Sequence, residues 1–276
     1  MKGLERAVVE GVELEYETRG SGEPVVLIHA GVFADWFELF QDEAALASRH
    51  RLVRYHRVGY AGSSRVAGPV SLVQQAAQLR GLLRRLGIPR AHLVGHSSSG
   101  NIALQLALDA PDMVGALVVM EPALMTVPSA ETARGFVGAA MGKYRAGDKA
   151  GAVDTFLQGV CDPDYRASLE RALPGAFDHA VADADAFFGQ EMPAIQQWSF
   201  TREDARRIRQ PVLAVIGEKN AQVPVWAERH GLLLEWLPAA QPFVLPGANH
   251  LLHVQNPRGL AEALADFFGR HPITAP

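Results

Sequence analysis

The chain has 276 residues, of which 48% are hydrophobic and 20% are charged. These proportions are typical of a globular protein and exclude a disordered or collagen-like chain. The formal net charge is −4 and the basic residues are scattered, which excludes the concentrated basic surface of a nucleic-acid-binding protein. A single cysteine, Cys161, can form neither an intrachain disulfide nor a cysteine-type zinc site.

The N-terminal segment contains an early glutamate and lacks the apolar core of a signal peptide. No apolar run reaches the roughly 20 residues that span a bilayer. We therefore expect a cytoplasmic protein that binds neither nucleic acid nor a membrane.

Short apolar runs alternate with segments of helical periodicity over the first half of the chain. Two runs on either side of Glu10-Gly11 predict a leading hairpin, and the alternation that follows is typical of a parallel sheet covered by helices. Further strands are predicted at 25–28, 52–55, 91–94 and 114–120, and helices at 71–86 and 101–110.

The strand pattern stops after Met120 and is replaced by alanine-rich helical segments with large apolar side chains. It returns at 211–217 and 242–245, and a helix is predicted at 257–270. We therefore predict one α/β core domain formed by residues 1–121 and 210–276. The intervening residues 122–209 are predicted to form a helical cap.

The segment from Gly95 to Gly100 joins a predicted strand to a predicted helix with almost no loop. A serine on such a turn projects its hydroxyl clear of the sheet, and the amides of the helix N-terminus face the atom it attacks. Ser97 is therefore the candidate nucleophile. The alternative is that the three consecutive serines only cap the helix. Ser99 departs from the commonest form of this motif, which has glycine there.

Together with the turns at 29–31, 57–63 and 246–250, this segment makes the chain resemble the α/β-hydrolase fold superfamily nearly from end to end. The resemblance implies an α/β-hydrolase fold, a mostly parallel central sheet flanked by helices with a helical cap inserted after the sixth strand. It also implies that His250, the histidine after the last strand, is the general base.

Position also favours His250 among the ten histidines. A serine hydroxyl needs a base whose pKa lies near the operating pH, and a Pro-Gly turn would bring His250 to the carboxyl edge of the sheet. An exposed loop histidine is the alternative. His253 would suggest a metal pair only with a third ligand, and we expect no metal because none is evident.

The acid of the triad departs from the commonest pattern. Many members of the superfamily have an aspartate where this chain has Asn220, and an amide cannot stabilise an imidazolium. Glu121 lies 24 residues after Ser97 (121 − 97), directly after the neighbouring predicted strand. This resembles a minority of the superfamily that includes some haloalkane dehalogenases and fungal lactonases. Glu218 and Asp35 remain alternative acids, and a structural charge at the cap hinge is the alternative role for Glu121.

The oxyanion hole is predicted to consist of the backbone amides of Ser98 and Gly31, with Val32 as the alternative second donor. The large apolar residues of the cap suggest an apolar substrate, although each alone is more typical of a core. The expected substrate contacts are Val32, Phe187, Met192 and Trp198.

The leading hypothesis is a serine esterase or lactonase that cleaves a small-molecule ester or lactone with an apolar body through an acyl-enzyme, without a cofactor. A homodimer is left open. A carbon–carbon bond hydrolase or cofactor-free oxygenase on the same fold is one alternative. A ligand-binding protein with slow or no catalysis is another, and Asn220 and Ser99 favour it. The usual dehalogenase chemistry is disfavoured because position 97 is not a carboxylate.

Overall fold

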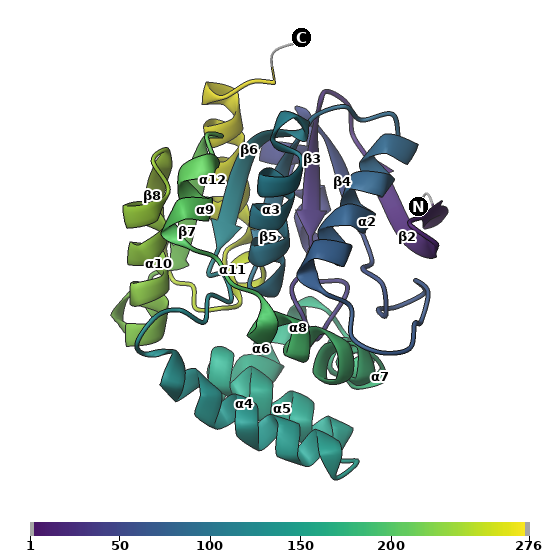
Figure 1. Cartoon of the computed structure of the whole chain (residues 1–276), viewed down its shortest axis with the longest axis vertical. Helices are drawn as coiled ribbons and strands as arrows, with labels where there is room; N and C mark the ends of the chain where they lie inside the picture. Colours follow the sequence, from purple (N-terminus) through teal and green to yellow (C-terminus); the bar gives the residue numbers. More distant parts are fainter. Residues whose placement is uncertain (1–2, 274–276) are drawn as a thin grey trace.

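The computed structural model describes residues 3–273 and is organised around an eight-stranded sheet (Figure 1). The strand order is β1-β2-β4-β3-β5-β6-β7-β8, and all pairs are parallel except β1 with β2 and β2 with β4. This confirms the predicted mostly parallel α/β fold. The strands are β1 (Glu5–Val9), β2 (Val12–Arg19), β3 (Glu23–Ile28), β4 (His50–Tyr55), β5 (Ala91–His96), β6 (Val114–Met120), β7 (Val212–Gly217) and β8 (Ala240–Leu245).

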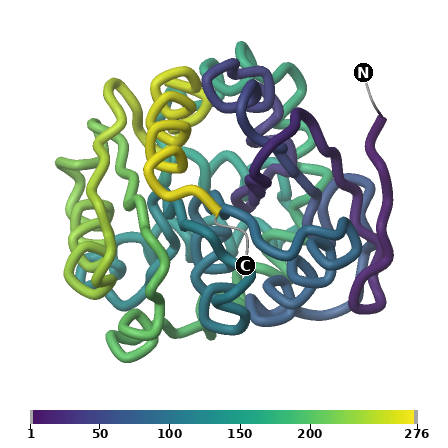
Figure 2. The backbone as a smooth tube through the Cα atoms, turned by 90° about the horizontal axis from the view of Figure 1, so that it is seen from above, coloured from purple at the N-terminus to yellow at the C-terminus, as the bar shows by residue number. Residues whose placement is uncertain are grey.

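Helices cover both faces of the sheet (Figure 2). The central strands are apolar on both sides, so successive residues such as Val26 and Leu27 enter different core clusters. One face packs against α2 (Leu72–Arg85), α3 (Ser98–Asp109), α9 (Arg202–Arg207) and α10 (Pro224–Trp236), and the other against α1 (Ala44–Ala47) and α12 (Pro257–Arg270).

A run of helices between β6 and β7 lies beyond the carboxyl ends of the parallel strands (Figure 1). We call these helices, together with the loops that join them, the insertion; they fall in the segment predicted as a cap. They are α4 (Ala130–Arg145), α5 (Lys149–Val160), α6 (Tyr165–Ala172), α7 (Ala176–Ala182), the π-helix η3 (Asp185–Glu191) and α8 (Met192–Gln197).

The remaining elements are short. They are η1 (Leu39–Asp42), η2 (Pro111–Met113), η4 (Asn220–Gln222) and α11 (Leu252–Gln255). Within residues 3–273, no helix combines the length and the apolar character that crossing a bilayer requires.

A buried ion pair ties the insertion to the core. Arg57, in the turn after β4, is 1% exposed, and its two Nη atoms each lie 3.0 Å from a carboxylate oxygen of Glu191 in η3. The Tyr60 hydroxyl donates to the same carboxylate. Nearby, Asp183 accepts from the amide of Ala61 at 3.0 Å. The turn after β4 and the insertion are therefore joined through charged groups that are out of contact with solvent.

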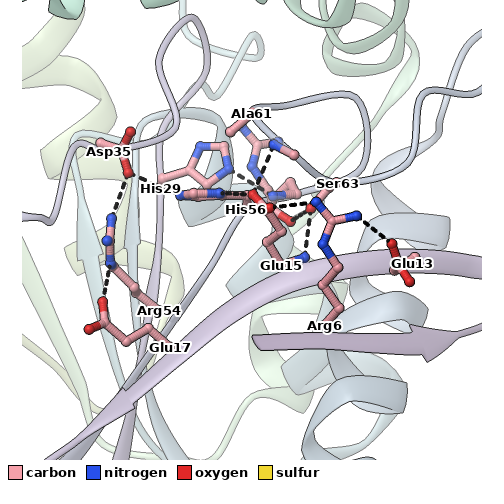
Figure 3. Close-up of polar contacts among 12 residues, drawn as sticks. Arg6, Glu13, Glu15, Glu17, His29, Asp35, Arg54, His56, Ala61 and Ser63 are labelled. Carbon is pink, nitrogen blue, oxygen red and sulfur yellow. Dashed lines mark hydrogen bonds and ion pairs between the residues drawn. The ribbon is translucent and has the colours of Figure 1, made fainter. Parts of the chain in front are cut away.

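A second polar network holds the loop that follows β3 (Figure 3). Asp35 in this loop accepts from Arg54 at 2.6 Å and from Nε2 of His56 at 3.0 Å. The other ring nitrogen of His56 donates to Glu15 at 3.1 Å. Burial alone would lower the pKa of His56, but the Asp35 and Glu15 carboxylates outweigh burial and raise it. The network therefore favours an imidazolium between two carboxylates and fixes the loop.

We expect the destabilisation caused by His56→Gln to depend on pH. The folded-state pKa of His56 is raised, so its contribution is fully present below the unfolded value of about 6.5 and is lost as pH rises through the folded value. The loss in the free energy of unfolding should be about 1–3 kcal/mol larger at pH 5.5 than at pH 9. Denaturant unfolding measures it, with His271→Gln as control. An equal loss at both pH values would contradict the expectation.

Candidate active site

Ser97 occupies the sharp turn between β5 and α3. It is the single residue between His96 and Ser98, and its backbone adopts φ 55° and ψ −124°, a conformation that costs a non-glycine residue about 1–3 kcal/mol. A Cβ atom at Gly95 would lie 2.5 Å from the carbonyl oxygen of Ser99, so only glycine fits there. The close approach of strand and helix therefore forces the Ser97 side chain outward at the end of the sheet.

The Ser99 hydroxyl explains the departure from the commonest motif. Ser99 is fully buried, accepts from the His96 amide at 2.8 Å and donates to the carbonyl oxygen of Ile28 in β3 at 2.5 Å. The hydroxyl thus joins the turn at 95–100, which we call the elbow, to the end of β3.

We expect Ser99→Ala to destabilise the protein by about 1–3 kcal/mol, because it leaves a buried amide and a buried carbonyl without their partner. Chemical denaturation of the purified variant measures this loss. Ser48→Ala removes an exposed hydroxyl bonded to the Ala44 carbonyl and should cost less than about 0.5 kcal/mol. A loss at Ser99 no larger than at Ser48 would show that the hydroxyl has no structural role.

Glu121 contacts His250 at the carboxyl edge of the sheet. The register that pairs His96 with Met120 places the residue after β6 beside the elbow. Oε2 of Glu121 lies 2.6 Å from Nδ1 of His250, and both side chains are nearly fully buried. When Glu121 is ionised, its carboxylate can only accept, so Nδ1 of His250 carries the proton and Nε2 is left with a free lone pair.

Two further donors hold the Glu121 carboxylate. Gly217, the last residue of β7, donates its amide to Oε1 at 2.9 Å, and Asn220 donates its side-chain Nδ2 to Oε2 at 2.8 Å. Asn220 thus bonds to the same oxygen as His250. It stands at the position where the resemblance implied an acid, and here it supports a carboxylate that follows the neighbouring strand β6.

Burial sets the electrostatics of this pair. It raises the pKa of Glu121 to about 7, while the Gly217 amide, Asn220 and the positive charge of Arg229 act in the opposite direction, so Glu121 is ionised only above about neutral pH. Burial also lowers the pKa of His250, and the Arg229 charge adds to that effect. His250 is consequently neutral at rest, as a general base must be.

The alternative acids lie elsewhere. Glu218 is exposed and accepts from the amide of Gly247 at 2.7 Å. Asp35 belongs to the His56 network described above. His253 is buried against Phe37, with ring centroids 4.7 Å apart. Among the described residues, no cluster of three or more metal-binding side chains is present.

Two residues of α10 contribute to the site although the sequence analysis did not single them out. The Trp226 indole stacks on the His250 imidazole with ring centroids 4.4 Å apart and an interplanar angle of 24°. The Arg229 guanidinium lies over the same indole, 4.8 Å from its centroid. No helix was predicted between the last two strands, so neither residue could be assigned to the site. The sequence Val-Pro at 223–224, with proline in the first turn of a helix, was the available signal.

Ser97 and His250 line one cavity of about 490 Å³, enclosed by the sheet edge and the insertion. The lining includes three of the four expected substrate contacts, Val32, Phe187 and Met192. The other contributors are residues of the elbow, the loops after β3 and β6, and α4, α5, α8 and α10.

The proposed oxyanion donors also line this cavity. Gly31, Val32 and Ser98 all border it, and Val32 has a positive φ of 73° that turns the chain after β3. A Cβ atom at Gly31 would lie 2.3 Å from a ring carbon of Phe187, so glycine permits the insertion to approach the loop. The choice of Gly31 or Val32 as second donor stays a prediction.

Trp198 corrects one expectation, because it is not among the residues that line the cavity. Its indole nitrogen donates to Gln105 on α3 at 2.7 Å, and its ring stacks on Phe200 at 5.7 Å with an interplanar angle of 11°. The chain leaves α8 toward the α3 face of the sheet, so this half-buried ring packs against the edge of the core there.

A family model described as the alpha/beta hydrolase family matches residues 25–263. The chain belongs to the alpha/beta hydrolase family. Within this family, a protein named "Putative carbamate hydrolase RutD" from Klebsiella pneumoniae (strain 342) is 31% identical over 84% of this chain and 86% of its own length. The dihydrolipoyllysine-residue acetyltransferase component of the acetoin cleaving system from Pseudomonas putida is 28% identical over 91% of this chain, which spans 64% of that protein.

Solved structures of hydrolases share the fold. A thermophilic esterase from Thermogutta terrifontis superposes with a TM-score of 0.81 at 19% identity, covering 98% of this chain and 100% of the esterase. The enol-lactonase from Burkholderia xenovorans LB400 superposes with a TM-score of 0.80 at 23% identity, covering 96% of this chain and 100% of the lactonase. The family and the names of these relatives support a hydrolase.

Proposed function

We propose that this protein is a serine hydrolase that cleaves a carboxylic ester or a lactone with an apolar body. The observation that carries the proposal is the 2.6 Å contact between His250 and Glu121, made beside a cavity that Ser97 also lines. The strained backbone at Ser97 supports it, because strain of this kind is kept where a side chain must be held in place. The names of the esterase and enol-lactonase neighbours are consistent with this substrate class.

In the first half of the reaction, the Ser97 hydroxyl oxygen attacks the carbonyl carbon while Nε2 of His250 accepts its proton. Glu121 stabilises the imidazolium that forms, and the amides of Ser98 and Gly31 donate to the oxyanion. The bond to the leaving oxygen then breaks, and His250 returns the proton to the alkoxide.

In the second half, His250 takes a proton from water, and the resulting hydroxide attacks the acyl carbon. Ser97 leaves and regains its proton from His250, which releases the acid. With a lactone, the leaving alkoxide stays attached to the acyl chain, so the product is a hydroxy acid. No step requires a cofactor or a metal.

The cavity lining supports an apolar substrate body. Phe136, Met141, Phe156 and Phe187 contribute side chains from three elements of the insertion, and the aromatic pair Phe156 and Phe187 has centroids 4.7 Å apart. Contacts of this kind favour an aliphatic or aromatic group over a strongly hydrated one.

The contact of Asn220 removes it as an argument for a ligand-binding protein with slow or no catalysis. Asn220 donates to the Glu121 carboxylate and thereby favours the ionised acid that the proposed base requires.

Intact-mass analysis after exposure to a fluorophosphonate tests the nucleophile without a known substrate. We expect one adduct on the folded wild type, because a base within the cavity activates Ser97. Ser97→Ala and acid-denatured wild type are the controls, and both should stay unmodified. An adduct that persists in Ser97→Ala, or its absence from the folded wild type, would contradict the proposed nucleophile.

Glu121→Gln should lower kcat/KM on an activated ester by about 10³–10⁴-fold, because an amide neither stabilises the imidazolium nor selects the tautomer. Steady-state kinetics with a p-nitrophenyl ester measure this loss.

The matched variant is Asn220→Ala, which removes one donor from the same carboxylate and should cost about tenfold or less. It should also move the acid limb of the pH profile upward by roughly one unit, since loss of a donor to the ionised form raises the pKa of Glu121. A larger loss for Asn220→Ala than for Glu121→Gln would overturn the assignment of the acid.

A further inference from the structure

Arg229 brings a buried cation into the proposed catalytic cavity. It is 4% exposed and borders the cavity from α10. Nε donates to the carbonyl oxygen of Leu124 at 2.8 Å, and one Nη lies 3.8 Å from the sulfur of Met125. The guanidinium also lies over the Trp226 ring. Within residues 3–273, its recorded partners are a carbonyl, a thioether and an aromatic ring, and all three are neutral.

A buried guanidinium without a carboxylate is costly, because it gives up hydration that neutral partners replace only in part. The same protein pairs another deeply buried arginine, Arg57, with Glu191 through two separate contacts. The two sites differ in electrostatics as well. Glu191 outweighs burial and raises the pKa of Arg57, whereas burial lowers the pKa of Arg229 to about 10 despite the charge of Glu121. Arg229 therefore stays charged at neutral pH.

The cavity lining has an unbalanced charge. Among the described residues it includes Arg134, Arg145 and Arg229 and contains no aspartate or glutamate. Arg134 and Arg145 are exposed residues of α4, whereas Arg229 is deep in the cavity, one aromatic ring away from His250. Charges of one sign in a cavity with low-dielectric walls raise the local concentration of the opposite ion. The lining therefore favours an anionic ligand.

We propose that Arg229 binds a carboxylate on the substrate, so that the preferred ester or lactone carries a free carboxylate beside its apolar body. The inference rests on the proposed hydrolase function and names its substrate class. Nε is engaged by the main chain, whereas one Nη atom has only the weak thioether acceptor of Met125, a contact that a carboxylate oxygen can replace while its second oxygen pairs with the other Nη. The planar edge formed by the two Nη atoms matches the two oxygens of one carboxylate and its single charge.

Arg229 also supports the protein itself, since it holds the loop after β6 through Leu124 and its charge acts on Glu121 and His250. Its replacement should therefore lower the rate of hydrolysis of every substrate. The measurement that isolates carboxylate recognition is a ratio between two substrates that share the same reacting ester.

The test compares the p-nitrophenyl monoesters of succinic, glutaric and adipic acid with the same esters in which a primary amide replaces the distal carboxylate. The wild type should prefer the carboxylate member of at least one pair by about 10- to 100-fold in kcat/KM, mainly through KM. Arg229→Gln should bring that ratio close to one. Arg229→Lys should keep part of it, because the charge is retained without the planar edge.

Calorimetric binding of the same pairs to Ser97→Ala gives a readout that does not depend on turnover. The carboxylate member should bind more tightly, and Ser97→Ala combined with Arg229→Gln should lose the difference. Arg202→Gln, which removes a surface arginine paired with Glu235, is the matched exchange that should leave the preference intact.

The inference would be overturned if the wild type showed equal kcat/KM for the carboxylate and the amide member of every pair and Ser97→Ala bound both equally or bound neither. A preference that survives Arg229→Gln would also overturn it. The proposed function is judged separately by the fluorophosphonate adduct. An adduct without carboxylate preference rejects only the role of Arg229, whereas carboxylate binding without an adduct rejects the serine hydrolase.

Discussion

The arrangement of the site depends on how the buried carboxylate of Glu121 is satisfied. An ionised acid in the interior is stable only where donors surround it. Here the donors come from two segments of the chain: His250 follows β8, whereas the Gly217 amide and Asn220 lie at and just after the end of β7. These segments meet because the parallel strands end at one edge of the sheet. One carboxylate thus aligns the ends of β6 and β7 and the histidine loop.

The other half of the site is built by close approaches between the core and the insertion. Gly31 lets Phe187 pack against the loop after β3, and the Ser99 hydroxyl fastens the elbow to the end of that strand. Arg57 and Glu191 fix the insertion over these segments. The core therefore supplies the polar groups Ser97, His250 and Arg229 to the cavity. The insertion supplies mostly apolar groups, with Arg134 and Arg145 as the charged exceptions. This combination suits a substrate whose reacting group differs in polarity from its body.

The sequence predicted the strands and the core helices α2, α3 and α12, because both faces of each central strand are apolar and glycines mark the turns. It also predicted that Ser97, Glu121 and His250 lie at one site, since residues that follow neighbouring parallel strands share one edge of the sheet. It could not place Trp226 and Arg229, because side chains that reach a site from the middle of a helix leave no local motif. Trp198 was wrongly assigned to the cavity, because hydrophobicity alone does not tell whether an aromatic ring packs in the core or lines a cavity.

The buried contact between Arg57 and Glu191 also limits how the insertion can move. Swinging it off the core would break a charge pair whose members are shielded from water, and each charge would be uncompensated until solvent reached it. Entry to the cavity is therefore easier through rotation of side chains along its margin, which takes picoseconds to nanoseconds, than through microsecond hinge motion of whole helices. The rate at which a ligand enters would then depend on the side chains along the cavity margin and not on displacement of the insertion.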